Sequence, residues 1–134
     1  MKNYFILLSI IFPSLVHAGE IDCENTIKTR EMNICSSMKV DAANIILEKY
    51  LAKAQERYAQ ETAAIDLLNK SQDAWVLYQK AYCDAIYELW SDGSIRGVIF
   101  GGCMLRLTKL RTHKIWEDYL TYMDSTPPIF PEPK

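Results

Sequence analysis

The chain has 134 residues, a length that suits one domain and is too short for two of ordinary size. It carries 15 basic and 17 acidic residues, for a formal net charge of −2. This balance excludes the strongly basic surface that binding to nucleic acid or to anionic lipid requires.

The first eighteen residues have the features of a secretory signal peptide. Lys2 provides a positive charge, residues 4–16 are mostly apolar, and residues 16–18 offer a cleavage site before Gly19. The apolar run is shorter than the roughly 20 residues that span a bilayer. We therefore expect a mature form, without a membrane span, that is periplasmic or secreted. Loss of Lys2 leaves 14 basic residues against 17 acidic ones.

Three helices are predicted for the mature chain, over residues 29–62, 66–90 and 94–123. Proline is absent between residues 29 and 123, and the glycines there fall between residues 93 and 102. Such stretches, rich in Ala, Leu, Glu, Lys and Gln, favour helix, and no run alternates long enough to predict a strand. The fold class expected is an all-α antiparallel three-helix bundle within residues 19–123, with Ser94 as the N-cap of the third helix.

Apolar residues three or four positions apart predict the buried faces of these helices. The predicted stripes are Cys35, Met38, Ala42, Ile46, Tyr50, Ala54 and Tyr58; Leu68, Trp75, Tyr78, Tyr82, Ile86 and Leu89; and Ile99, Cys103, Leu107, Leu110, Leu120 and Met123.

The four cysteines all lie after the predicted cleavage site, and an even number of cysteines in an exported chain favours disulfides. Zinc is a weaker alternative, because no closely spaced cysteine pair exists and His113 is the one mature histidine. Of the three possible pairings we favour Cys23–Cys35 and Cys83–Cys103, since each joins neighbouring segments. The second bridge would staple the helical hairpin that turns near residue 93.

Residues 124–134 contain four of the five prolines and should form an extended, polyproline-like tail. A ligand for a proline-recognition domain is one interpretation, and a plain disordered terminus is the simpler one.

No catalytic residue, cofactor or metal site is expected. His113 and Glu117 stand one helical turn apart, but nothing else in the sequence completes a catalytic group, so a surface pair is the simpler interpretation. A small domain has many aromatic residues here: Trp90, Tyr87, Trp116, Tyr119 and Tyr122. Core or half-buried packing is the simpler interpretation, and any of them that is exposed would suit a protein interface.

The chain resembles the LprI-like lysozyme inhibitor family of small secreted bacterial proteins, over about residues 22–120. The resemblance rests on four cysteines in order, with other motifs between them. These are Asp22-Cys23, Glu31-Met32-Asn33 before Cys35, Ala43 and Leu47, Gln72 with Ala74-Trp75 before Cys83, Gly93-Ser94-Ile95, and Cys103 before Leu107-Thr108 and Arg111. The resemblance supports the two disulfide pairings chosen above.

Four positions depart from the family pattern. Asn44 and Glu48 stand where the family has Asp and Asn, and Gln79-Lys80 stand where it has Arg-Asp. Because buried polar groups need partners, these are either compensating changes in one network or the mark of a branch with another partner.

The resemblance implies a non-enzymatic inhibitor that binds lysozyme or another peptidoglycan-degrading hydrolase. We expect the turn that carries Trp90, Asp92, Ser94 and Arg96 to enter the substrate groove, with Arg96 meeting a catalytic carboxylate. An ordinary turn between helices is the simpler interpretation of these residues. Two further functions fit the same features: an immunity protein against a wall-hydrolase toxin delivered to the periplasm, and a non-catalytic envelope assembly or structural factor.

Overall fold

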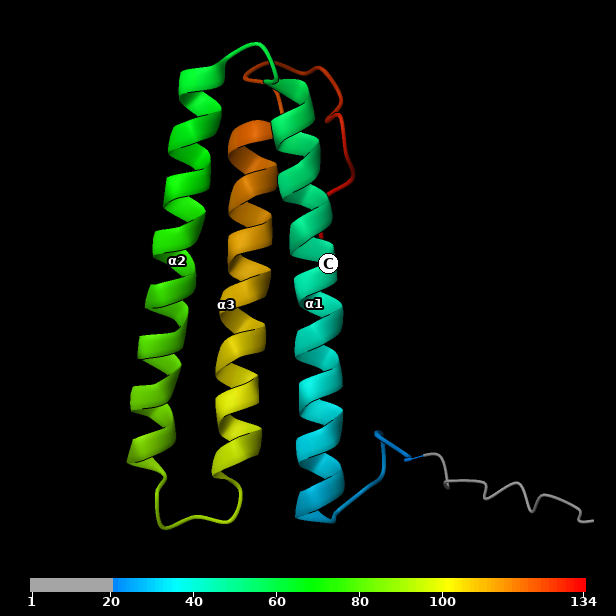
Figure 1. Ribbon diagram of the computed structural model, residues 1–134. Coiled ribbons are helices and arrows are strands. Elements are labelled where there is room, and N and C mark those ends of the chain that lie inside the picture. The colour runs from blue at the N-terminus through cyan, green and yellow to red at the C-terminus, as the bar shows by residue number, and fades with distance from the viewer. Residues whose placement is uncertain (1–20) are drawn as a thin grey trace, which may run out of the picture.

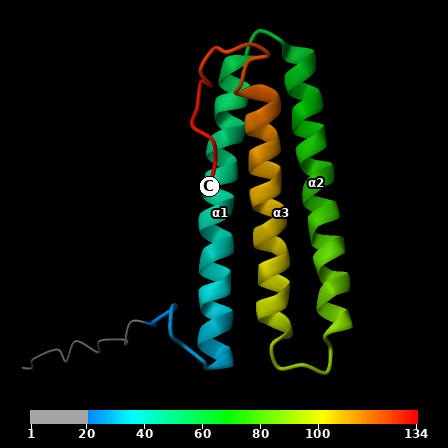
Figure 2. The ribbon, with the colours of Figure 1, turned by 180° about the vertical axis from the view of Figure 1, so that it is seen from behind.

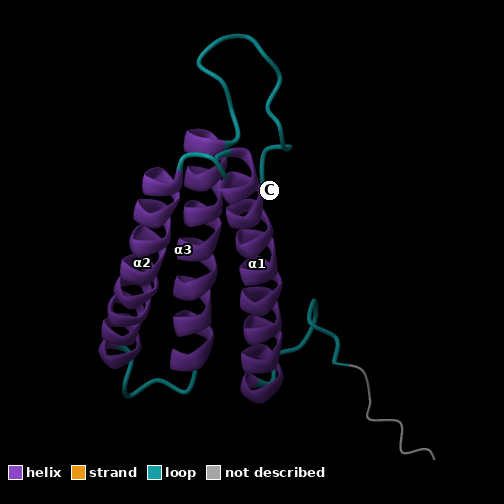
Figure 3. Cartoon of the chain, turned by 45° about the horizontal axis from the view of Figure 1, so that its top comes forward, coloured by secondary structure: helices purple, strands orange, loops and turns teal. Residues whose placement is uncertain are grey.

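The computed structural model describes residues 21–134, and the predicted signal peptide lies outside the described residues. Within that range the chain forms three helices, α1 (Thr29–Arg57), α2 (Thr62–Leu89) and α3 (Arg96–Tyr119), and no strand. Figure 3 shows the same composition of helices and loops. The predicted all-α fold with antiparallel helices is confirmed.

The helices lie side by side in one layer, with α3 in the middle (Figure 1). α3 packs against both neighbours, most extensively against α1, whereas α1 and α2 hardly touch. The core lies along α3, and all three helices contribute side chains to it. Its main cluster contains Leu47, Tyr50, Ala54, Leu68, Ile115 and Leu120.

Several helix boundaries differ from the prediction: the end of α1, the start of α2 and both ends of α3, which stops at Tyr119. α3 begins at Arg96 rather than Ser94, and its N-cap is Ile95, which makes no side-chain capping bond. The prediction of Ser94 as the N-cap was wrong, because residues 90–96 form successive turns in which Gly93 N–H donates to the Trp90 carbonyl and Arg96 N–H to the Gly93 carbonyl. α1 ends at Arg57, and a short turn through residues 58–61 leads into α2.

All three predicted apolar stripes differ in part from the observed buried faces. In the third stripe Leu110 and Met123 are exposed, whereas Thr108, Thr112 and Ile115 of α3 are buried. On α1 the buried positions include Ala43 and Leu47, while Met38 and Ile46 are exposed. On α2 the inward positions are Leu68, Gln79 and Cys83, so Tyr78 and Tyr82, which the sequence placed in the core, are exposed.

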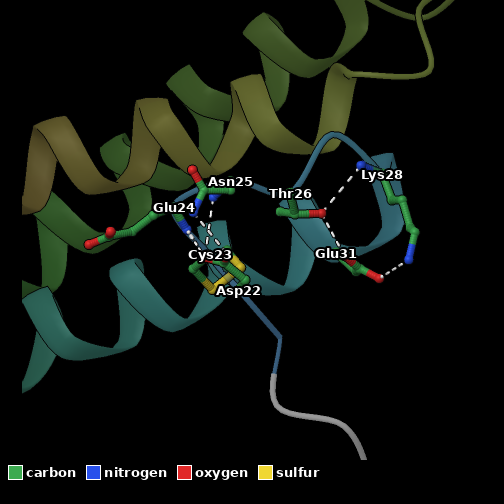
Figure 4. Close-up of a disulfide and its surroundings, with 8 residues drawn as sticks. Asp22, Cys23, Glu24, Asn25, Thr26, Lys28 and Glu31 are labelled. Atoms are coloured by element: carbon green, nitrogen blue, oxygen red, sulfur yellow. Dashed lines mark hydrogen bonds and ion pairs between the residues drawn. A yellow bond between two sulfur atoms is a disulfide. The ribbon is translucent and has the colours of Figure 1, made fainter.

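Both predicted disulfides are present. Cys23–Cys35 holds the N-terminal segment against the first turns of α1, and Cys83–Cys103 links α2 to α3. Figure 4 shows the turn around Cys23, in which the Asp22 carboxylate accepts hydrogen bonds from Glu24 N–H and from the backbone and side chain of Asn25. The side-chain bond from Asn25 is the main reason that the pKa of Asp22 is lowered below its usual value.

The C-terminal tail is docked on the helices, and Ile129 N–H donates to the Leu120 carbonyl at the end of α3. It leaves the end of α3 and returns along α1 (Figure 2). The Phe130 ring packs edge-on against Tyr50 at 4.9 Å, the Trp116 indole donates to the Phe130 carbonyl, and Tyr50 Oη donates to the Pro131 carbonyl. Burial raises the pKa of the Tyr50 phenol above its ordinary value. Prolines cost the tail little entropy on docking, because their φ angles are fixed in advance.

Candidate partner-binding surface

The loop between α2 and α3 forms one end of the molecule, and it carries the four residues that the sequence selected for partner binding. We call residues 90–96 the tip. Asp92 and Ser94 are exposed, and the Trp90 side chain is 50% exposed. Ile95 adds a second exposed apolar side chain that the sequence analysis did not single out.

The tip is held by its own backbone and by the nearby bridge. Hydrogen bonds run from Ser91 N–H to the Glu88 carbonyl and from Gly93 N–H to the Trp90 carbonyl. The Cys83–Cys103 bridge ties together the two helices that carry the loop. A loop constrained in this way loses little conformational entropy when it binds.

Arg96 is anchored to its own chain rather than extended into solvent. Its guanidinium carbon lies 4.5 Å from the centroid of the Tyr87 ring, and Nη1 donates to the Ser91 carbonyl over 3.3 Å. The Tyr87 ring is itself held edge-on against Phe100. A guanidinium has five N–H donors, so the cation retains donors for a carboxylate while its position is set by Tyr87.

A groove lined by side chains of all three helices is the second candidate surface. Gln79 of α2 is 4% exposed, and its Nε2 donates to the Met104 carbonyl over 3.1 Å and to Thr108 Oγ1 over 2.8 Å. Thr108 of α3 in turn donates to Asn44 Oδ1 of α1 over 3.1 Å. These bonds make a polar network, Asn44–Thr108–Gln79, that crosses the whole layer.

The network explains two of the four departures from the family pattern. Asn44 and Gln79 replace an acidic and a basic residue, and both bond to the same hydroxyl. In this chain both positions hold neutral amides, and Thr108 bridges them. The sequence alone did not predict this contact, because the two positions are 35 residues apart. Glu48 and Lys80 have no part in the network, and Lys80 pairs with Asp84 on the surface of α2.

The groove above the network has a volume of about 330 Å³. It is lined by Asn44, Leu47, Glu48, Gln72, Trp75, Val76, Gln79 and Met104. Separately from this network, Arg111 of α3 donates to Gln72 Oε1 and Ser71 Oγ of α2. Several residues of the family motifs line the groove, among them Leu47, Gln72 and Trp75. The side chains of Asn44, Gln72 and Gln79 already hydrogen-bond to other residues of this chain.

His113 and Glu117, one helical turn apart, do not pair with each other. His113 Nε2 lies 3.0 Å from Glu132 of the tail, and Glu117 pairs with Lys114 instead. Within residues 21–134 no group of three metal-ligating side chains comes together. No helix of this part of the chain is both long enough and apolar enough to cross a bilayer.

Comparison with known proteins identifies the family. The sequence profile described as "Lysozyme inhibitor LprI" matches residues 22–115, which include all four cysteines. An uncharacterized protein of Rhizobium meliloti (strain 1021) is 26% identical over 123 residues, which cover 84% of this chain and 88% of that protein. No solved structure matches the chain. The match spans the three helices up to the last turn of α3 and both disulfides, and the chain belongs to the LprI lysozyme inhibitor family.

Proposed function

We propose that the protein is exported, loses residues 1–18, and acts in the periplasm as a non-catalytic inhibitor of lysozyme or another peptidoglycan-degrading hydrolase. The observation that carries this proposal is the match of residues 22–115 to the lysozyme inhibitor family. The two disulfides support the compartment, because such bonds persist in oxidising environments outside the cytoplasm.

The tip is the part of the surface that best fits a hydrolase cleft. It exposes Trp90 and Ile95, and its backbone is fixed by internal hydrogen bonds. Glycoside hydrolases of this class work with carboxylates on the walls of a cleft. In our proposal Trp90 fills a sugar-binding position, and Arg96, held by Tyr87, donates to a catalytic carboxylate.

Titration of the oxidised mature protein against lysozyme and a panel of bacterial wall hydrolases tests the function. We expect saturable loss of cell-wall lysis near one-to-one stoichiometry with at least one of these enzymes. Arg96→Glu should weaken inhibition by about tenfold or more, because it places like charges together in a desolvated contact. Trp90→Ala should have a similar effect, since truncation of a central aromatic residue at an interface costs about 2 kcal/mol or more.

Arg106→Glu is the matched control. It makes the same charge change on an exposed residue of α3, about 15 Å further along the helix axis. Equal inhibition by the Arg96 and Arg106 variants and the native protein would remove the tip from the binding surface. No inhibition of any enzyme by folded native protein would refute the function itself.

A further inference from the structure

One flank of α2 is exposed along almost the whole helix and carries no charge. We define the α2 stripe by its members, Leu67, Ser71, Ala74, Tyr78, Ala81, Tyr82, Ala85 and Leu89. All eight are exposed, and Leu67 and Leu89 at its ends are 65% and 79% exposed. Spacings of three and four residues place them on one side of the helix.

The charges of α2 are segregated from this stripe. Successive residues of a helix turn by about 100° around its axis, so each position can be assigned to a flank. All charged residues of α2 fall within an arc of roughly 80° that lies outside the stripe. They are Asp66, Lys70, Asp73, Lys80, Asp84 and Glu88. A helix flank that faces only water usually carries charged residues, so a long uncharged flank indicates contact with another molecule.

No part of the described chain covers the stripe. The hydrogen bonds that dock the tail go to α1, to α3 and to Leu120 just after α3. The inward side of α2 is used by Gln79 and Cys83 in the seam with α3, on a different side of the helix from Tyr78. Arg111 borders the stripe, where its guanidinium is engaged by Gln72 and Ser71.

The order of residues in the stripe matches itself when the helix is reversed. Tyr78 lies midway between Leu67 and Leu89, so an antiparallel copy centred on Tyr78 sets each leucine against the other. The same register sets Ala74 against Tyr82 and Ser71 against Ala85. In this register each Tyr82 faces an alanine and the two Tyr78 rings meet at the centre, so a two-fold axis makes the contact self-complementary.

From this pattern we infer that the α2 stripe is the interface of an antiparallel homodimer of this protein, with the two-fold axis at Tyr78. The stripe is about 33 Å long and one helix wide, or about 400 Å² per partner. That is about half of the roughly 800 Å² of a standard interface, so the dimer should be weak and in exchange with the monomer. The two tips would point in opposite directions, so one dimer presents two of them.

Sedimentation equilibrium of the oxidised mature protein from about 5 µM to about 500 µM tests this inference. The native mass should rise from one chain toward two across that range. Tyr78→Lys should remain monomeric, because the two-fold axis brings the two new charges together. Ala81→Lys, a second change within the stripe, should weaken the dimer as well.

Val76→Lys is the matched control, since Val76 is 49% exposed against 54% for Tyr78 and lies on the groove side of the same helix. This variant should dimerise like the native protein. Circular dichroism checks that each variant keeps its helices. A native protein that stays monomeric at about 500 µM overturns the inference, and so does a dimer that Val76→Lys breaks but Tyr78→Lys leaves intact.

A pair of double variants tests the antiparallel register. Leu67→Glu with Leu89→Lys sets opposite charges against each other across the antiparallel interface, whereas Leu67→Glu with Leu89→Glu sets like charges together. The first should dimerise at least about tenfold more tightly than the second. Equal dissociation constants would refute this register. Inhibition of a hydrolase by monomeric Tyr78→Lys would show that dimerisation and the proposed function are separate properties.

Discussion

At the scale of single residues, the most informative group is the network that joins Asn44, Thr108 and Gln79. A buried amide is stabilising only when its polar atoms find partners, and here three helices supply them. The inward position of Gln79 also explains the exposure of Tyr78 and Tyr82. α2 turns its amide, rather than its tyrosines, toward α3.

The paired departure from the family pattern gives a prediction about coupling. Asn44→Asp or Gln79→Arg alone should destabilise the fold by about 2–4 kcal/mol, because each places an uncompensated charge in a mostly buried site. The double variant should recover part of this loss, with a coupling energy of about 1–3 kcal/mol. Urea unfolding of the four proteins measures the cycle. Strict additivity would mean that the two positions do not act together.

At the scale of helices, α1 and α3 approach closely because α3 has glycine where α1 passes. A methyl group at Gly101 would collide with Ser36 Oγ and lie 3.1 Å from Ser36 Cβ. Gly102, the next residue, has no atom of another segment within 4 Å of the same position. The close packing of α3 on α1 therefore depends on Gly101 and not on Gly102.

The two glycines make a matched pair of substitutions with opposite expected signs. Gly101→Ala should destabilise the protein by about 1–3 kcal/mol, because it overpacks the seam between α1 and α3. Gly102→Ala should stabilise it by about 0.5–1 kcal/mol, since alanine loses less backbone entropy in a helix. Thermal unfolding of both variants measures the difference. A loss of stability in Gly102→Ala comparable to that in Gly101→Ala would contradict this account.

At the scale of the whole molecule, a single layer of helices buries less side-chain surface than a closed bundle of the same length. The fully buried hydrophobic residues are correspondingly few. A small core of this kind is typically supplemented by covalent bonds. The two bridges act at the same end of the layer, where the N-terminal segment and the tip both lie.

Removal of the Cys83–Cys103 bridge should therefore have a large effect. In the chain-entropy model a bridge across 20 residues stabilises the fold by about 3 kcal/mol. Cys83→Ala with Cys103→Ala should lower the free energy of unfolding by about that amount, and it should weaken hydrolase inhibition because the tip loses its constraint. Urea unfolding and the lysis assay measure the two effects. A stability change below about 1 kcal/mol would show that helix packing alone fixes the hairpin.

The sequence by itself determined the features that depend on local chemistry. Breaker-free stretches specified three helices, the glycine-containing turn separated the second from the third, and the cysteine spacing selected both bridges. These features follow from backbone propensity and short-range chain closure, which neighbouring residues decide.

Tertiary structure alone decided which flank of each helix faces the core and where the tail lies. The apolar pattern of α2 is broad enough to allow several rotations, and the packing of Gln79 and Cys83 against α3 selected one of them. The tail is held by hydrogen bonds from Tyr50 of α1 and Trp116 of α3, two residues that lie on different helices. Both outcomes depend on contacts between distant segments, which a linear pattern does not encode.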